Sequence, residues 1–454
     1  MTRTLQDLNV TFIREALAHG AEQELVVLLQ EQHPADLAEA IEPLTEEEKR
    51  RVFQLLNPEQ AADVLVELND LSREEILEET SAARLAEIAE EMESDEAADL
   101  LATLSEATQA EVLRRMGREE MKDLAELLRY REDSAGGIMK RELLAVRGDS
   151  TVAEAVAAFQ QLSHTEDVED IHNVFVVDAE RHLVGVLPIR RLLLVDAATP
   201  IHRVMDPNIL KVRTDVDQEE VARLFKKYDL LSIPVVDEGD RLVGRITVED
   251  IVDVITEESG EDLLRMGGVD EDDRIFCLPS RSVRKRLPWL TINLATAMLA
   301  ASVVAIFQDT ISQMVTLAVF MPIVAGMGGN AGTQTLTLIT RGIAMGELSL
   351  TNARRALIKE SIVALANGVA IGVFMGLGTY LWKGDWILGS VLGLALIVNM
   401  LVAGVVGTII PVLLKRFGVD PAVASGIIVT TFTDCFGFFF FLGLASLALR
   451  FYNL

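Results

Sequence analysis

A single carboxylate stands in the middle of the last long apolar stretch of the sequence. Asp434 is the only charged residue between positions 421 and 449. An ionised carboxylate at mid-membrane depth is costly unless it faces water, a cation or a partner group. No Lys or Arg lies inside the other apolar stretches, and Thr430, Thr431 and Thr433 add hydroxyl oxygens beside it. Because hard divalent cations prefer oxygen ligands, the pattern favours a cation site; a protonated, hydrogen-bonded Asp is the alternative.

A second polar set interrupts another apolar stretch. The segment MPIVAGMGGNAGTQTLTL over 321–338 places Pro322 and four glycines around Asn330, Thr333 and Gln334. Because Pro and Gly disfavour a helix interior, they predict a broken helix whose carbonyl and side-chain oxygens line a watery path. Small residues also permit close helix packing, and this interpretation stays open beside the first.

A third set consists of acidic residues that share one face of a predicted helix. They are Asp250, Asp253, Glu257 and Glu261, flanked by Glu258 and Asp262. Like charges three and four residues apart on a helix repel one another. A solvated face is one interpretation; the other is that cations bind between this face and a second acidic surface, such as Asp95 and Asp99.

Five apolar stretches are long enough to cross the hydrocarbon core of a bilayer, which takes about 20 residues of helix. They cover residues 287–307, 312–340, 361–382, 386–414 and 421–449. Basic clusters precede the first stretch, separate the second from the third, and separate the fourth from the fifth. Under the positive-inside rule these clusters face the cytoplasm, so the preceding half of the chain is expected in the cytosol and the C-terminus outside.

Charge divides the chain into two unlike halves. The net charge is −29, of which residues 281–454 contribute +6 from 12 Lys and Arg against 6 Asp and Glu, so residues 1–280 carry −35. Such an acidic region repels nucleic acid and attracts cations. The start of the chain lacks an apolar core with a cleavage site, so no signal peptide is expected. Two cysteines without a CxxC pair argue against a disulfide framework or a zinc site.

The acidic half contains two kinds of internal repeat. Residues 1–130 follow a helical pattern in which 32–56, 56–80 and 92–116 resemble one another, as in a helical superhelix; an ordinary helical bundle is the alternative. Over 139–256 a strand–helix–strand–strand–helix pattern occurs twice, with VFVVD matched by IPVVD. This duplication resembles a tandem pair of CBS domains.

These patterns predict a multidomain protein with one α/β region between helical ones. Its parts are an all-α superhelical N domain (1–130), two α/β CBS repeats (131–202 and 203–256), an acidic connecting helix (257–280) and a transmembrane domain of five helices (281–454). The six histidines all precede residue 203 without metal-ligand spacing, and we expect them to be surface or core residues.

The order of these parts resembles the MgtE family of magnesium channels and transporters over nearly the whole chain. The motifs that carry the resemblance are AGGIM at 135–139, PIVAGMGGNAGTQ at 322–334, GVDPAVAS at 418–425 and TDCFGF at 433–438.

The resemblance implies a homodimer with a central pore, in which Asp434 of both subunits coordinates hydrated Mg²⁺. Asn330, Thr333, Gly426 and Thr430 are implied to lie along the ion route, although relatives carry Asn at the positions of Thr333 and Gly426. The connecting, or plug, helix is implied to close the pore when Mg²⁺ bridges the cytosolic domains. The matching acidic positions are Asp95, Glu219, Asp229, Asp250, Asp253, Glu258, Glu261 and Asp262.

CBS pairs in some proteins bind adenosine nucleotides through a Thr and an Asp in the turn G-h-h-[ST]-x-x-D. The second repeat supplies Thr247 and Asp250 in GRITVED, whereas the first carries Pro188 and Arg191 in GVLPIRR. One ATP per pair is therefore a candidate ligand beside Mg²⁺.

Taken with the resemblance, the sequence predicts a multi-pass protein of the cell membrane that takes up Mg²⁺ under negative feedback. Mg²⁺ would hold the acidic domains together and close the pore, and its loss would let them repel and open it. A transporter of Co²⁺ or Mn²⁺ on the same scaffold, or a membrane-bound Mg²⁺ sensor, is the alternative. An enzyme is not expected, because no nucleophile–base set, phosphate loop or paired catalytic carboxylates stand in a recognisable context.

Overall fold

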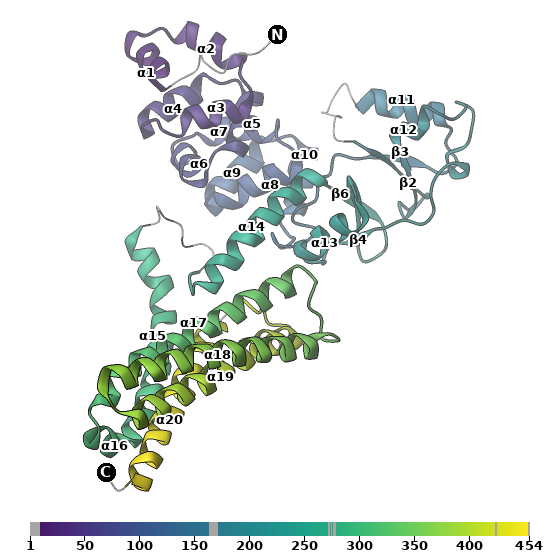
Figure 1. Cartoon of the computed structure of the whole chain (residues 1–454). Helices are drawn as coiled ribbons and strands as arrows, with labels where there is room; N and C mark the ends of the chain where they lie inside the picture. Colours follow the sequence, from purple (N-terminus) through teal and green to yellow (C-terminus); the bar gives the residue numbers. More distant parts are fainter. Residues whose placement is uncertain are drawn as a thin grey trace, which may run out of the picture. The chain divides into compact units, whose positions relative to one another are not determined.

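The computed structural model describes residues 10–162, 171–270, 273, 275, 278–422 and 425–452. The chain divides into two compact units, Met1–Thr256 and Glu257–Leu454. The first unit contains short helices followed by two small sheets, and the second contains long helices (Figure 1).

The N-terminal helices begin at a regular interval. Their N-caps stand at residues 33, 45, 57, 69, 81, 93, 105 and 117, a spacing of 12. At all but Glu93 and Gly117 the cap side chain accepts a hydrogen bond from the first turn, as Thr45 does from Glu48 in a capping box. The helices are α1 (Val10–His19), α2 (Glu22–Gln30), α3 (Pro34–Ile41), α4 (Glu46–Leu55), α5 (Pro58–Glu67), α6 (Asp70–Leu77), α7 (Ala82–Ala89), α8 (Ser94–Thr103), α9 (Glu106–Arg115) and α10 (Arg118–Leu127).

Alternate helices of this series pack on each other. Helix α3 lies on α5, α5 on α7 and α7 on α9, while α4 lies on α6 and α8 on α10. Two helices therefore form one repeating unit, because each helix buries its apolar face against the helix two positions along. The predicted helical N domain is confirmed for the described residues.

The two CBS repeats have the same sheet topology. In the first, β1 (Leu144–Arg147) runs parallel to β2 (Asn173–Val177), which is antiparallel to β3 (Leu183–Pro188); in the second, β4 (Val212–Arg213), β5 (Ser232–Val236) and β6 (Leu242–Thr247) pair in the same way. The associated helices are α11 (Val152–Leu162), α12 (Ile189–Leu192), a 3₁₀ turn (Ile201–Arg203) and α13 (Gln218–Tyr228). The predicted duplication is confirmed.

The N domain and the second CBS repeat share one apolar core. Ala135 and Met139, which follow the last N-terminal helix, are fully buried in the same cluster as Leu101 and Val221. Burial of this common surface ties the two domains into one unit.

The predicted connecting helix has different ends from those expected. Helix α14 runs without interruption from Val248 to Met266, so it starts within the second CBS repeat and stops well before residue 280. Gly268 ends it with a left-handed φ of 71°, and the Val269 N–H bonds back to the Leu264 carbonyl. Asp270 then pairs with Lys285 at 2.7 Å, which holds this connection to the next helix.

The second unit is built from α15 (Pro279–Ile306), α16 (Gln308–Gln313), α17 (Thr316–Ala344), α18 (Ala353–Lys383), α19 (Trp386–Arg416) and α20 (Ser425–Tyr452). Within the described residues, four helices are long and apolar enough to span a membrane: α15, α18, α19 and α20. Five were predicted. Helix α17 has 29 residues but falls outside this group, because Asn330, Gln334 and several glycines lower its hydropathy.

The predicted break in this second stretch is wrong. Helix α17 continues through Pro322 and all four glycines to Ala344. In an apolar environment each unpaired backbone group costs free energy, so the helix is kept. Gly328 and Gly332 serve packing instead: a Cβ at Gly328 would stand 2.2 Å from Asn399 Nδ2, and one at Gly332 would stand 2.6 Å from Val429 Cγ1.

Candidate functional site

Helices α17 and α20 lie against each other where the polar residues predicted from the sequence are found. Gly332 of α17 packs on Val429 and lies near Thr433 of α20. Beside this contact, Asn330 and Thr333 are exposed on α17. The Gly332 contact lets the two backbones approach closely, as small residues do between membrane helices.

Asp434 follows the buried Thr433 on α20. Its side chain is half-buried, and among the described residues it has no hydrogen bond or ion pair. Thr433 donates to the Thr430 carbonyl at 3.0 Å, so that hydroxyl is engaged, whereas Thr430 itself is exposed. The carboxylate therefore keeps its oxygens available for a ligand.

Exposed polar side chains form a stripe along α17 that includes the predicted Asn330 and Thr333. Its members are Asn330, Thr333, Gln334 and Thr337, all exposed on the single chain. Amide and hydroxyl groups in a spanning helix are unfavourable against lipid and normally face protein or a water-filled cavity. The stripe is therefore a candidate surface for contact with protein or water.

Gly426 lies at the start of α20, close to the end of α14. A Cβ at Gly426 would stand 3.7 Å from the Met266 carbonyl oxygen. One residue earlier, Arg265 bonds both Glu261 and Asp420, each at 2.8 Å. The end of α14 is thus tied to the loop that precedes the Asp434 helix, and Asp420 is a residue that the sequence reasoning did not single out.

Asn399 is a buried polar residue that the sequence reasoning missed. It has no exposed surface, donates from Nδ2 to the Val324 carbonyl at 2.9 Å, and leaves Oδ1 without a partner among the described residues. Its amide fills the space left by Gly328 on α17 and Gly437 on α20. The sequence offered one signal for it. Gly328 and Gly437 each leave space for a side chain from another helix, but the sequence does not show which helix fills that space.

Glu360 is the second missed residue of this unit. It is 4 % exposed, pairs with Lys359 and accepts a hydrogen bond from Thr335 of α17 at 3.3 Å. It stands directly before the apolar stretch that begins at residue 361. The structure shows that it holds α18 to α17.

Asp95 and Asp250, predicted from distant parts of the sequence, come together in the first unit. Lys140, which is 3 % exposed, contacts Glu93, and its ammonium group lies 3.0 Å from Asp250 Oδ1; Asp95 acts on the same ammonium through space. Asp95 is 7 % exposed, and its Oδ1 has no hydrogen-bond partner among the described residues.

Burial and mutual repulsion shift the pKa values of these acids. Burial raises the pKa of Asp95 well above its ordinary range; the ammonium of Lys140 opposes this shift, and the carboxylates of Asp250 and Glu93 add to it. Burial also raises the pKa of Glu96, to about 7. Burial would lower the pKa of Lys140, but the surrounding carboxylates outweigh it and raise that pKa.

The other acidic positions do not form one cluster. Glu219 lies at the start of α13 with Arg223 at 2.5 Å, whereas Asp229 caps the opposite end with a φ of 51°. At about 1.5 Å per residue these two carboxylates are too far apart to share one ion within a chain. Burial raises the pKa of Asp253 on α14, and Asp250 adds to the shift.

The later acids of α14 fall in the second unit. Glu258, Glu261 and Asp262 are all partly buried near the end of the helix. Glu261 bonds Arg265, as described above, and each of the three takes part in further polar interactions.

Thr247 and Asp250, the predicted nucleotide pair, are bonded to each other. Asp250 Oδ2 accepts from the Thr247 N–H at 2.8 Å and from its hydroxyl at 2.7 Å, which caps the start of α14. The pair is therefore held in a fixed position at the end of β6.

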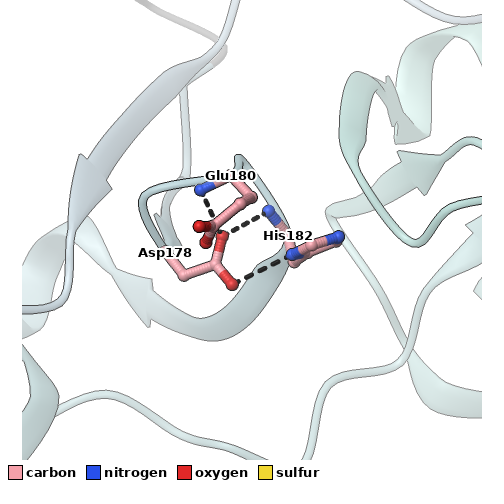
Figure 2. A group of neighbouring side chains, drawn as sticks. All are labelled: Asp178, Glu180 and His182. Carbon is pink, nitrogen blue, oxygen red and sulfur yellow. Dashed lines mark hydrogen bonds and ion pairs between the residues drawn. The ribbon is translucent and has the colours of Figure 1, made fainter.

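One further group of possible metal ligands lies in the turn between β2 and β3 (Figure 2). Asp178, Glu180 and His182 offer atoms within 4.8 Å of one another. Asp178 already accepts from the N–H groups of Glu180 and His182 at 2.9 and 2.8 Å, and its other oxygen lies 3.0 Å from His182 Nδ1. These bonds are those of a tight turn, so the cluster is explained by local structure.

Fold and site together define a class: a multi-pass membrane protein with soluble N-terminal domains and a carboxylate within a spanning helix. The family model for MgtE, described as a divalent cation transporter, matches residues 321–444. The MgtE intracellular N domain matches 32–133, and the CBS domain matches 135–197 and 201–257.

Similar proteins agree along most of the chain. The magnesium transporter MgtE of Thermus thermophilus is 39 % identical over 326 residues, which cover 71 % of this chain and 72 % of that protein. The MgtE of Enterococcus faecalis is 35 % identical over 327 residues, 72 % of each. A crystal structure of the cytosolic domain of the Mg²⁺ channel MgtE in complex with ATP is 38 % identical, covers 54 % of this chain and 99 % of its own, and has a TM-score of 0.51.

The chain therefore belongs to the MgtE family of magnesium transporters. Since the relatives that match over most of its length are transporters, the chain is grouped with transporters and not with enzymes.

Proposed function

We propose that this protein is a Mg²⁺-selective channel or transporter for magnesium uptake and that Asp434 binds the hydrated ion on its way through the membrane. The observation that supports this most is the half-buried Asp434 carboxylate, which has no partner among the described residues and follows a helix contact built from Gly332. Mg²⁺ gives up its waters reluctantly, so one carboxylate per chain with hydroxyl and amide groups nearby suits a hydrated ion.

Asn330, Thr333, Gly426 and Thr430 are the proposed neighbours along the ion route. Asn330, Thr333 and Thr430 are exposed on the single chain. A homodimer would place the polar stripe of α17 and both Asp434 carboxylates toward a shared aqueous path, which removes polar groups from contact with lipid. This arrangement also explains why so polar a helix lies within a membrane unit.

Flux across a panel of divalent cations tests the function. The purified chain is reconstituted in liposomes, and uptake of Mg²⁺, Mn²⁺, Co²⁺ and Ca²⁺ is recorded with an ion-sensitive dye. Mg²⁺ is expected to enter fastest and to compete with the others. Preferred uptake of Co²⁺ or Mn²⁺ would favour the alternative transporter, and no flux of any ion in protein-bearing liposomes would favour a sensor.

Gating by cytosolic Mg²⁺ is the second part of the proposal. The soluble domains lie on the cytoplasmic side, and the C-terminus lies outside, in accordance with the basic clusters around the apolar stretches. Bound Mg²⁺ neutralises the acidic residues, among them Glu219, Asp229 and Asp253, and favours the closed pore. The ion must bind the closed state more tightly than the open state, or it shifts nothing. The end of α14, tied to Asp420 by Arg265, is the proposed plug.

Limited proteolysis of the full-length chain tests the gating. We expect millimolar Mg²⁺ to slow cleavage between the domains, because neutralised acids no longer repel. Replacing Glu258, Glu261 and Asp262 by their amides should weaken this protection. The matched control replaces Glu46, Glu59 and Glu67, which are exposed on the N domain, and should leave the protection unchanged. Equal cleavage with and without Mg²⁺ in the unmodified chain would refute the gating.

ATP binding by the CBS pair is a separate candidate. A solved relative at 38 % identity holds ATP in its cytosolic domain, and Thr247 and Asp250 are fixed together at the start of α14. We propose that the second repeat supplies these two side chains to one nucleotide per pair. Fluorescence polarisation with a labelled ATP would measure this binding in the unmodified chain and in Thr247→Ala.

A further inference from the structure

Two cap positions of the N-terminal helices, Glu93 and Gly117, make no capping hydrogen bond, and of these only Glu93 has a side chain. In the 12-residue register the cap position of α8 is Glu93, which makes no capping hydrogen bond. Its carboxylate instead contacts Lys140, while Ser94 bonds Glu142 at 2.9 Å and accepts from the Arg141 N–H at 2.8 Å. The side chains at the start of α8 therefore bind the segment that begins the CBS pair, and they do not cap their own helix.

Lys140 is fixed at this place by its backbone. It exchanges hydrogen bonds of 2.7 and 2.9 Å with Arg245 of β6, five residues before Asp250. The side chain reaches inward, so that the ammonium group contacts Glu93 and lies 3.0 Å from Asp250 Oδ1. Lys is rarely buried so completely unless it is paired with acids.

The acids around this ammonium come from the starts of two helices, α8 and α14. Glu93 precedes α8, Asp95 lies in the first turn of α8, and Asp250 lies in the first turn of α14. Asp95 is buried with Oδ1 lacking a hydrogen-bond partner among the described residues; burial raises its pKa, and the positive charge of Lys140 opposes that shift through space. We call these four residues the junction cluster: Glu93, Asp95, Lys140 and Asp250.

We propose that Lys140 is the resident cation of the junction cluster and occupies the position that a divalent ion bound by Asp95 and Asp250 would otherwise take. A second cation at Asp250 Oδ1 would meet the ammonium, which already lies 3.0 Å from that oxygen, and be repelled. The N domain is thus held to the second CBS repeat without Mg²⁺. The consequence for regulation rests on the proposed function. Regulatory Mg²⁺ then binds at the other acidic residues, chiefly those at the end of α14.

Counting bound ions tests the proposal. The full-length chain in detergent is dialysed against Mg²⁺ alone, and bound Mg²⁺ per chain is measured by atomic emission. The unmodified chain and Asp95→Asn are expected to bind equally. Lys140→Met should bind one additional ion, and Asp95→Asn in that background should remove it. Loss of an ion from the otherwise unmodified chain on Asp95→Asn would overturn the proposal.

Hydrogen exchange at the junction gives an independent measurement. In the unmodified chain, amides at the start of α8 and around Lys140 should exchange equally with EDTA and with Mg²⁺. Lys140→Met leaves buried carboxylates unpaired and should speed exchange by roughly tenfold or more in EDTA, with recovery in Mg²⁺. The matched control is Lys211→Met, whose partner Asp240 is exposed, and it should leave these amides unchanged.

Mg²⁺ protection of the junction amides in the unmodified chain would overturn the proposal. If Lys140→Met fails to fold, the number of Mg²⁺ ions bound by the Asp95→Asn chain still tests it. Absence of Mg²⁺ flux in liposomes would refute the proposed function but would not change the ion counts. The two failures can therefore be told apart.

Discussion

Asp434→Asn is expected to abolish Mg²⁺ flux while the folded protein is retained. The amide has nearly the size and shape of the carboxylate, so the packing of α20 against Gly332 should survive. What is lost is the charge. Two unit charges 4 Å apart interact by about 4 kcal/mol at an effective dielectric constant near 20, and a divalent ion doubles this. Even a quarter of that energy, about 2 kcal/mol, would reduce ion occupancy roughly thirtyfold.

The control for this experiment is a carboxylate elsewhere in the same unit. Asp309 lies in the short helix α16, and Asp309→Asn should retain the flux of the unmodified chain. Size-exclusion profiles of both variants establish that the protein is folded. Flux through Asp434→Asn at the unmodified rate would show that this carboxylate is not on the ion route.

The sequence predicted Asp434 because one isolated charge in an apolar stretch is costly at any position in the fold. It could not predict the state of α17. Pro322 and four glycines are local signals against a helix, but the cost of unpaired backbone in an apolar environment depends on neighbours that only the fold supplies. Asn399 packs against Gly328, and Val429 packs against Gly332. Close helix packing, which the sequence analysis left open as the alternative, is therefore the role of these two glycines.

The junction cluster shows a different limit of sequence reasoning. Asp95 and Asp250 were suggested as partners by the acidic helix face and again by the resemblance, and the structure brings them together. Lys140 was overlooked, since a lone Lys in an acidic domain gives no periodic signal. The break in the cap register at Glu93 was the available clue, because an acid occupies a position where its neighbours in the series carry capping side chains.

Gly372→Leu is expected to destabilise the second unit strongly. Gly372 and Gly376 of α18 face Gly393 and Gly389 of α19, and a Cβ at Gly372 would stand 2.6 Å from the Gly393 carbonyl oxygen and 2.8 Å from Ile397. The nearest clashing atom belongs to the backbone of α19, so the clash is relieved only if α18 and α19 move apart along their common length. In the membrane, where helix association depends on such close packing, little remains to offset that separation.

The matched control lies on the same helix. Gly378 is exposed and has nothing within 4 Å of a Cβ, so Gly378→Leu places its side chain toward lipid. Both changes add the same helix propensity, and their difference isolates packing. Overpacking costs typically about 1–3 kcal/mol, and more when the clash is with backbone. Thermal unfolding in detergent should show a lowered midpoint or aggregation for Gly372→Leu only. Equal unfolding of the two variants would mean that the glycine contact between α18 and α19 does not hold this unit together.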